Sequence, residues 1–283
     1  MIAKSAKEVL LRALGVFFFA SFAVKVFPRL PMESDFTVAM TPGNNLIKVG
    51  CCGFRSSRDS YYPLLPAVEI QHTFYQPPQI STLERWREES PVGFEFTLKA
   101  WQLITHQAAS PTYRRLKREL TDKERQQCGS FRSSGIVKEA WGVTEACAHA
   151  LNARMILFQC PASFLPTKVN IERMRKFFAK IERDRLIFCW EPRGDWPRDV
   201  IKDLCDELDL WHVVDPFSAR TVTPDRCYFR LHGRRGWRYS YEDGELEELY
   251  SMLPEEGVSY VFFNNIKMHE DALRFKALVE AGR

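Results

Sequence analysis

The stretch LIFCWE, residues 186–191, decides the fold: five apolar residues stand in a row and a glutamate closes them. An apolar run without polar alternation is typical of a strand that is buried on both of its faces. An amphipathic pattern at Arg198–Leu208 follows after a short connection and predicts a helix. A buried strand followed by a helix is the repeating unit of a parallel sheet covered by helices on both sides.

The same unit recurs along the chain from Leu46 onward. Eight short apolar runs predict strands at Ile47–Cys51, Ala67–Gln71, Phe94–Lys99, Met155–Gln159, Leu186–Glu191, Leu210–Asp215, Cys227–His232 and Tyr260–Asn264. Amphipathic or charged stretches between them predict helices at Ser81–Glu89, Lys138–Asn152, Asn170–Arg183, Arg198–Leu208, Tyr241–Leu253 and His269–Glu280.

Eight alternating units predict an α/β fold, a closed (β/α)8 barrel of the TIM type. An open doubly wound sheet is the alternative, but Gly50-Cys51-Cys52-Gly53 after the first strand is not a dinucleotide-binding fingerprint. The gap Asp215–Cys227 is too short for a full helix. The gap Lys99–Met155 is long enough for an insertion, which includes the charge-rich segment Tyr113–Arg125. We therefore expect a single barrel domain with an insertion after the third strand.

The amino-terminal part of the chain differs from the rest. Basic residues precede an uncharged, phenylalanine-rich stretch at Ala13–Val24, which resembles a signal sequence but is short for a membrane span. Met32 and Met40 offer alternative starts, so an over-extended reading frame is the first interpretation and a signal sequence or anchor the second. We expect residues 1–45 to be an extension of either kind, with no firm membrane partner, and residues 46–283 to form the barrel.

Composition narrows the class of protein. Hydrophobic residues make up 45% of the chain, which is enough for a full core and excludes a disordered protein. The 40 basic and 36 acidic side chains leave a net charge of +4, too small to indicate a nucleic-acid partner by itself. The eight cysteines show no CxxC pair, which favours a reducing compartment, and we expect a cytoplasmic protein.

Polar side chains gather at the carboxyl ends of the predicted strands, where barrel enzymes place their chemistry. The candidate catalytic residues are Glu69, Glu191, His232, His106 and Asp215. The candidate substrate-binding residues are Gln71, Tyr75, Lys99, Gln159, Arg193, Arg230, Asn264 and Asn265. Residues two apart on a strand share a face, so Glu69/Gln71, Glu191/Arg193 and Arg230/His232 are expected to point into the barrel together.

Several blocks of the sequence resemble the domain of unknown function 72 family (YecE-like). They are residues 68–75 (VEIQHTFY), Lys99 with Thr105-His106, Phe131-Arg132, residues 158–161 (FQCP), Glu191-x-Arg193-x-x-Trp196, residues 228–233 (Tyr-x-Arg-Leu-His-Gly) and Phe263-Asn264-Asn265. The resemblance implies a (β/α)8 barrel with a polar pocket at the strand carboxyl ends. It implies no particular reaction.

Three functions stay open at this point. The first is an enzyme for an anionic or phosphorylated small molecule, with Lys99, Arg193 and Arg230 as an anion clamp. In it, Glu69 or Glu191 is the general base and His232 or His106 the acid.

The second is a divalent-metal phosphoesterase whose ligands are Glu69, Glu191, Asp215 and His232, although three cations share that rim and no metal site is assigned. The third is a non-catalytic nucleic-acid-binding module, which rests on the basic runs at 113–118 and 234–238. No cofactor motif stands out in the sequence.

Overall fold

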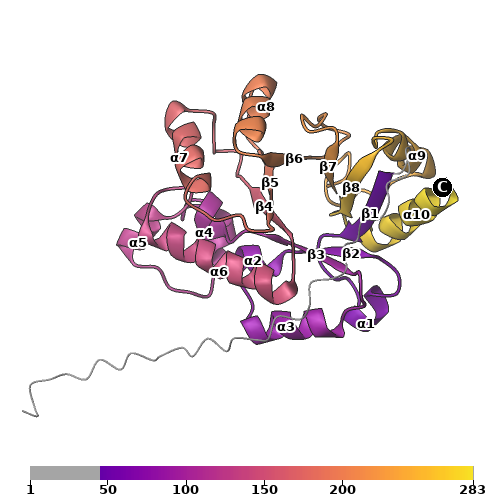
Figure 1. Cartoon of the computed structure of the whole chain (residues 1–283), viewed down its shortest axis with the longest axis horizontal. Helices are drawn as coiled ribbons and strands as arrows, with labels where there is room; N and C mark the ends of the chain where they lie inside the picture. The colour runs from indigo at the N-terminus through magenta and orange to yellow at the C-terminus, as the bar shows by residue number, and fades with distance from the viewer. Residues whose placement is uncertain (1–44, 283) are drawn as a thin grey trace, which may run out of the picture. The chain divides into compact units, whose positions relative to one another are not determined.

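A computed structural model describes residues 45–282 of the chain, which include almost all of the expected barrel (Figure 1). The strands of this part are β1 (Asn45–Cys51), β2 (Ala67–Ile70), β3 (Glu95–Lys99), β4 (Met155–Gln159), β5 (Ile187–Glu191), β6 (Leu210–Val214), β7 (Arg226–Leu231) and β8 (Gly257–Phe263). Its helices are α1 (Arg58–Tyr61), α2 (His72–Tyr75), α3 (Ile80–Glu89), α4 (Gln102–Thr105), the 3-10 helix η1 (Pro111–Arg115), α5 (Asp122–Gln127), α6 (Gly135–Leu151), α7 (Lys168–Phe178), α8 (Arg198–Glu207), α9 (Asp243–Ser251) and α10 (Met268–Ala281).

The expected extension lies outside the described residues, except for Asn45. Among the helices of residues 45–282, none combines the length and apolar character needed to cross a membrane.

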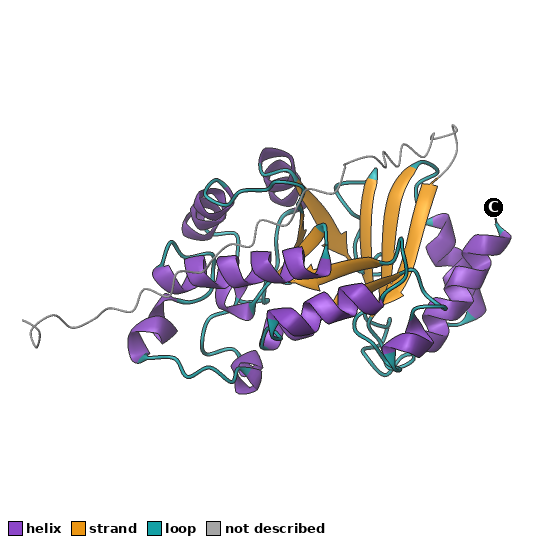
Figure 2. Ribbon diagram, turned by 60° about the horizontal axis from the view of Figure 1, so that its bottom comes forward, coloured by secondary structure: helices purple, strands orange, loops and turns teal. Residues whose placement is uncertain are grey.

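The eight strands form a closed, all-parallel barrel in sequence order. Closure comes from β1, which pairs with β2 on one side and with β8 on the other, where Cys51 lies opposite Phe263. Figure 2 shows the strands at the centre and helices outside them. The predicted (β/α)8 barrel is confirmed, and the doubly wound alternative is excluded because an open sheet leaves two unpaired edge strands.

The two unusual spacings in the sequence correspond to two features of the barrel. No helix lies between β6 and β7, as the short gap predicted. After β3, the chain forms α4, η1 and α5 before the long helix α6 leads into β4, and these elements are the predicted insertion. The phenol of Tyr113 in η1 donates to the carbonyl oxygen of His106 at 2.7 Å, which fixes the insertion near the end of β3.

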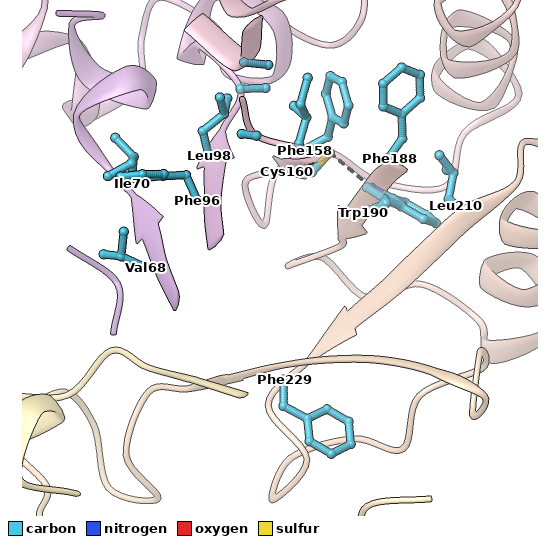
Figure 3. Packing of buried hydrophobic residues seen from close by; sticks show 14 of the residues in the cluster. Val68, Ile70, Phe96, Leu98, Phe158, Cys160, Phe188, Trp190, Leu210 and Phe229 are labelled. Atoms are coloured by element: carbon cyan, nitrogen blue, oxygen red, sulfur yellow. Dashed lines mark hydrogen bonds between the residues drawn. The ribbon is translucent and has the colours of Figure 1, made fainter. Parts of the chain in front are cut away.

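The outward faces of the strands pack against the helices through large apolar side chains (Figure 3). Phe158 of β4 and Phe188 of β5 lie edge to face with ring centroids 5.6 Å apart. The indole Nε1 of Trp190 donates to the Sγ of Cys160 at 3.3 Å, so its polar atom is paired within the core. Each strand is thus buried on both faces, by the helices on its outer side and by the barrel interior on its inner side. This explains why the apolar runs in the sequence are uninterrupted.

The lower interior of the barrel is filled with aromatic rings. Tyr228, Tyr260 and Phe262 are buried together, and the rings of Tyr228 and Phe262 have centroids 5.2 Å apart. Gly50 provides the room for them, because a Cβ at this position would overlap the carbonyl oxygen of Ala67 and lie 2.8 Å from Phe262. The barrel interior is therefore a packed aromatic core in its lower part, and the polar residues of the rim lie above this core.

Candidate functional site

The expected pairs of inward-pointing residues meet at the carboxyl-terminal mouth of the barrel. The side-chain amide of Gln71 donates to Glu69, Arg193 lies 2.7 Å from Glu191, and Arg230 lies 3.4 Å from the ring of His232. The members of each pair thus lie close together, which agrees with the two-residue period of a β-strand.

Arg230 lies at the centre of this group and is only 1% exposed. Its Nε and Nη2 donate to the two oxygens of Glu69 at 3.0 and 2.9 Å, and its Nη1 donates to Glu191 at 2.6 Å. Nη1 also approaches Gln159 at 3.4 Å, and Nη2 approaches the Sγ of Cys52 at 3.6 Å. Groups of the protein already accept hydrogen bonds from all three guanidinium nitrogens. Arg230 is therefore a buried counter-ion and does not suit the expected role of anion clamp.

Glu191 lies between two arginines, Arg230 and Arg193. Burial alone would raise the pKa of its carboxyl group. The charges of Arg230, Arg193, His232 and Lys99 outweigh burial and lower the pKa to about 2. A carboxylate with so low a pKa is a poor proton acceptor near neutral pH, so the expected role of general base does not fit Glu191. Its physical role is to neutralise the arginines.

Asp215 and His232 form the side of the mouth next to β6. The carboxylate of Asp215 accepts hydrogen bonds from the backbone N–H groups of His232 at 2.9 Å and Phe217 at 3.2 Å. The Nη2 of Arg193 lies 2.6 Å from the Nε2 of His232, and the Nδ1 of the same ring lies 3.6 Å from the carboxylate of Asp215. The imidazole thus lies between a guanidinium group and a carboxylate.

Lys99 ends β3 and is 4% exposed. Its Nζ lies 3.7 Å from the centre of the Phe74 ring, and within residues 45–282 it forms neither an ion pair nor a hydrogen bond. Burial is the largest cause that lowers the pKa of Lys99, and the positive charge of Arg230 lowers it further. The negative charges of Glu191 and Glu69 raise it by less, so the pKa falls to about 7. Lys99 is thus a buried amine that is close to half neutral at pH 7.

His106 lies near Lys99, with its ring edge to face on Phe74 and its Nδ1 2.8 Å from the hydroxyl of Thr105. Burial and the charge of Lys99 lower its pKa to about 3. The imidazole therefore stays neutral near pH 7, which argues against the expected role of general acid.

Two hollows lie at this end of the barrel. The first, called the mouth cavity, measures about 470 Å³ and opens directly above Arg230. It is lined by Cys52, Gly53, Phe54, Arg55, Gln71, His72, Phe74, Tyr75, Lys99, His106, Thr112, Arg115, Gln159, Arg230, Asn264 and Met268. The second, called the side cavity, measures about 800 Å³ and lies over the ends of β5 and β6, where Glu191, Arg193, Asp215 and His232 border it. The candidate residues thus divide between two adjoining spaces.

Asn264 and Asn265, predicted together, have separate positions. Asn264 lines the mouth cavity. Asn265 is buried outside it, where its amide donates to Asp271 at 2.6 Å and to the carbonyl oxygen of Tyr239 at 2.8 Å. The prediction that Asn265 belongs to the site is wrong for a simple reason: consecutive residues at a strand end point to opposite faces.

Arg55 and Arg115 also line the mouth cavity, although the sequence pattern did not predict them there. Arg55 follows β1, and Arg115 ends η1 with its guanidinium 3.5 Å from the centre of the Tyr75 ring. The basic run at 113–118 was the signal for Arg115, but only the folded insertion brings it to the mouth cavity.

The proposed metal ligands do not converge on one point. The guanidinium of Arg230 lies between Glu69 and Glu191 and bonds to both, where a cation would have to bind. Across residues 45–282, no group of three or more histidine, cysteine, aspartate or glutamate side chains has a spacing that would hold a metal ion.

A family model described as "Protein of unknown function DUF72" matches residues 55–282. The chain belongs to this family. A curated relative, the UPF0759 protein YunF of Bacillus subtilis, is 24% identical over 260 residues, which cover 78% of this chain and 84% of YunF.

Crystal structures of two DUF72 family proteins resemble the barrel. The protein from Enterococcus faecalis has a TM-score of 0.64 and 22% identity, covering 84% of this chain and 99% of its own. The protein from Thermotoga maritima has a TM-score of 0.62 and 21% identity, and the match covers 83% of this chain and 100% of the Thermotoga protein. At these identities the likeness shows the shared DUF72 barrel fold.

Proposed function

We propose that this DUF72 protein is an enzyme that acts on a small anionic compound bound in the mouth cavity. One observation carries the proposal: the described lining of this cavity contains no carboxylate, while Arg55, Lys99 and Arg115 in it form no ion pair within residues 45–282. The acidic groups of the rim, Glu69 and Glu191, are bonded to Arg230 beneath it. An unbalanced set of cations around a pocket attracts an anion.

The roles follow from which donors are unoccupied. Arg55 and Arg115 form no ion pair with a carboxylate of residues 45–282, so their guanidinium groups are available for a carboxylate or phosphate. Gln159 at the end of β4, and Gln71 and Asn264 directly after β2 and β8, add neutral amide groups to the lining. Lys99 supplies the reactive amine. Tyr75, whose ring supports Arg115, lines the same space.

The other two functions have less support. The metal-dependent phosphoesterase needs a cation where Arg230 already lies. A nucleic-acid-binding face would draw on the two basic runs, whose charge is partly neutralised, because Arg118 is bonded to Glu124 and Glu139, and Arg234 to Glu245 and Glu248.

All eight cysteines are buried free thiols. We therefore propose that the enzyme works in a reducing compartment such as the cytoplasm.

Thermal denaturation in the presence of small anions tests the proposal. A ligand at one hundred times its Kd adds about 2.7 kcal/mol to the free energy of unfolding, which raises the Tm of a domain of this size by roughly 5–10 °C. Phosphate, sulfate and small carboxylates at 10 mM form the first screen. At least one should raise the Tm, and Arg55→Gln with Arg115→Gln should remove most of the shift.

Arg114→Gln is the matched control. Arg114 precedes Arg115 in the same 3-10 helix and is exposed, but it does not line the mouth cavity. A shift that survives in the double variant, or that Arg114→Gln removes equally, contradicts the proposed site.

A further inference from the structure

Lys99 has the surroundings of a reactive amine. It is the last residue of β3, and its backbone carbonyl accepts a hydrogen bond from the hydroxyl of Thr73 at 2.7 Å, which fixes the strand end. The side chain runs along the Phe74 ring, and its Nζ faces the mouth cavity. Within the described part of the chain, no carboxylate is close enough to pair with it.

Lys48 provides a contrast at the opposite end of the same barrel. Its Nζ lies 3.1 Å from Glu95, so a carboxylate is its direct partner. Both lysines are partly or fully enclosed, but only Lys99 lacks an anionic partner. A lysine that is desolvated and close to another cation loses its proton readily and becomes a nucleophile. Arg230 is that cation, as the lowered pKa of Lys99 reflects.

We propose that Lys99 forms a Schiff base with the carbonyl carbon of an anionic aldehyde or keto compound in the mouth cavity. The inference rests on the proposed function, because the same cavity has to hold the anionic group of the substrate. Arg55 and Arg115 bind that group, while the carbonyl carbon meets Nζ.

The step balances without any redox partner. The lone pair of the neutral amine attacks the carbonyl carbon, the carbonyl π pair moves to oxygen, and a proton passes from nitrogen to oxygen to give a carbinolamine. A proton from solvent then joins the hydroxyl group, water leaves, and the nitrogen lone pair forms the carbon–nitrogen double bond of the iminium ion. The product is a cation, and the charges of Glu191 and Glu69 act on it favourably from a distance, as they do on protonated Lys99.

Reductive trapping with two aldehydes tests the inference on the full chain. The protein is incubated at pH 7 with sodium cyanoborohydride and either glyoxylate, which is anionic, or acetaldehyde, which is neutral. Peptide mapping by mass spectrometry gives the labelling rate of each lysine. The neutral fraction of Lys99 exceeds that of an ordinary lysine by a factor on the order of 1,000. Lower basicity offsets part of this, so we expect glyoxylate to label Lys99 at least tenfold faster than Lys48 and the exposed lysines.

Three outcomes separate this inference from the proposed function. Preferential labelling of Lys99 by glyoxylate, reduced in the Arg55→Gln/Arg115→Gln variant, supports both. Preferential labelling by both aldehydes alike, unchanged in that variant, supports the reactive amine and contradicts the anion site. Labelling of Lys99 no faster than that of Lys48 overturns the inference, whereas the proposed function stands if small anions still raise the Tm through Arg55 and Arg115. Because the labelling is measured on the unmodified chain, no variant at Lys99 has to fold.

Discussion

Replacing Lys99 with methionine should stabilise the protein at neutral pH. The folded state lowers the pKa of this amine from 10.5 to about 7, which corresponds to about 5 kcal/mol against the charged form. Methionine has a similar length, carries no charge and makes favourable sulfur contacts with aromatic rings, here that of Phe74. The substitution also removes a favourable charge near Glu191, so we expect a net gain of about 1–3 kcal/mol in the free energy of unfolding.

The gain should depend on pH in a defined direction. Between pH 7 and about 10, the unfolded chain holds a proton on Lys99 that the folded chain has released. The stability of the wild type therefore rises with pH in this window. The advantage of Lys99→Met should be largest below pH 7, and it should shrink by up to about 1.4 kcal/mol for each pH unit above 7. Urea denaturation at pH 6, 7, 8.5 and 9.5, followed by circular dichroism, measures this difference.

Lys48→Met is the matched control at the other end of the barrel. Lys48 is paired with Glu95, so its replacement should cost no more than about 1 kcal/mol and should show no comparable dependence on pH. A Lys99→Met variant that is less stable than the wild type by more than about 1 kcal/mol at pH 6 would contradict this expectation. An effect of the same size at every pH would also contradict it, because Lys99 would then be an ordinary ammonium group.

Three further substitutions test the site and the fold. Glu191→Gln should lower the free energy of unfolding by about 3 kcal/mol at pH 7, because the folded state lowers the pKa of this carboxyl group to about 2. In urea denaturation the loss should shrink as the pH falls from 4.5 to 2. An unchanged urea midpoint at pH 7 would contradict the role of Glu191 as a counter-ion. Asn265→Ala should lower the free energy of unfolding by about 1–3 kcal/mol in the same assay, because it removes two buried hydrogen bonds. Asn264→Ala should change it by no more than about 0.5 kcal/mol and should weaken anion binding. Equal effects of the two substitutions on stability would contradict the different positions of these residues. Gly50→Ala should lower the Tm strongly or prevent folding, because its Cβ would overlap the carbonyl oxygen of Ala67, and a Tm within 2 °C of the wild type would contradict this.

The inward and outward positions of the rim follow from local periodicity. Glu69 and Gln71, or Glu191 and Arg193, share a face because a strand has a two-residue repeat. The same rule, counted from the inward-pointing Phe262, places Asn264 inside and Asn265 outside, so the sequence contained the information that the prediction of Asn265 overlooked. Arg115 is different, because its distance from β3 along the chain gives no indication of where the insertion folds back.

The sequence by itself determined the barrel, since eight buried runs separated by helical patterns have few other ways to cover both faces of every strand. It also determined that charged residues crowd one rim. Only the tertiary structure decided which of those charged residues pair with each other. Arg230 takes both Glu69 and Glu191 as partners and leaves Lys99 with none, so that burial, and after it the charge of Arg230, lowers the pKa of the lysine. The physical reason is that ion pairing and desolvation depend on separations of a few ångströms between residues far apart in the chain, which no sequence pattern specifies.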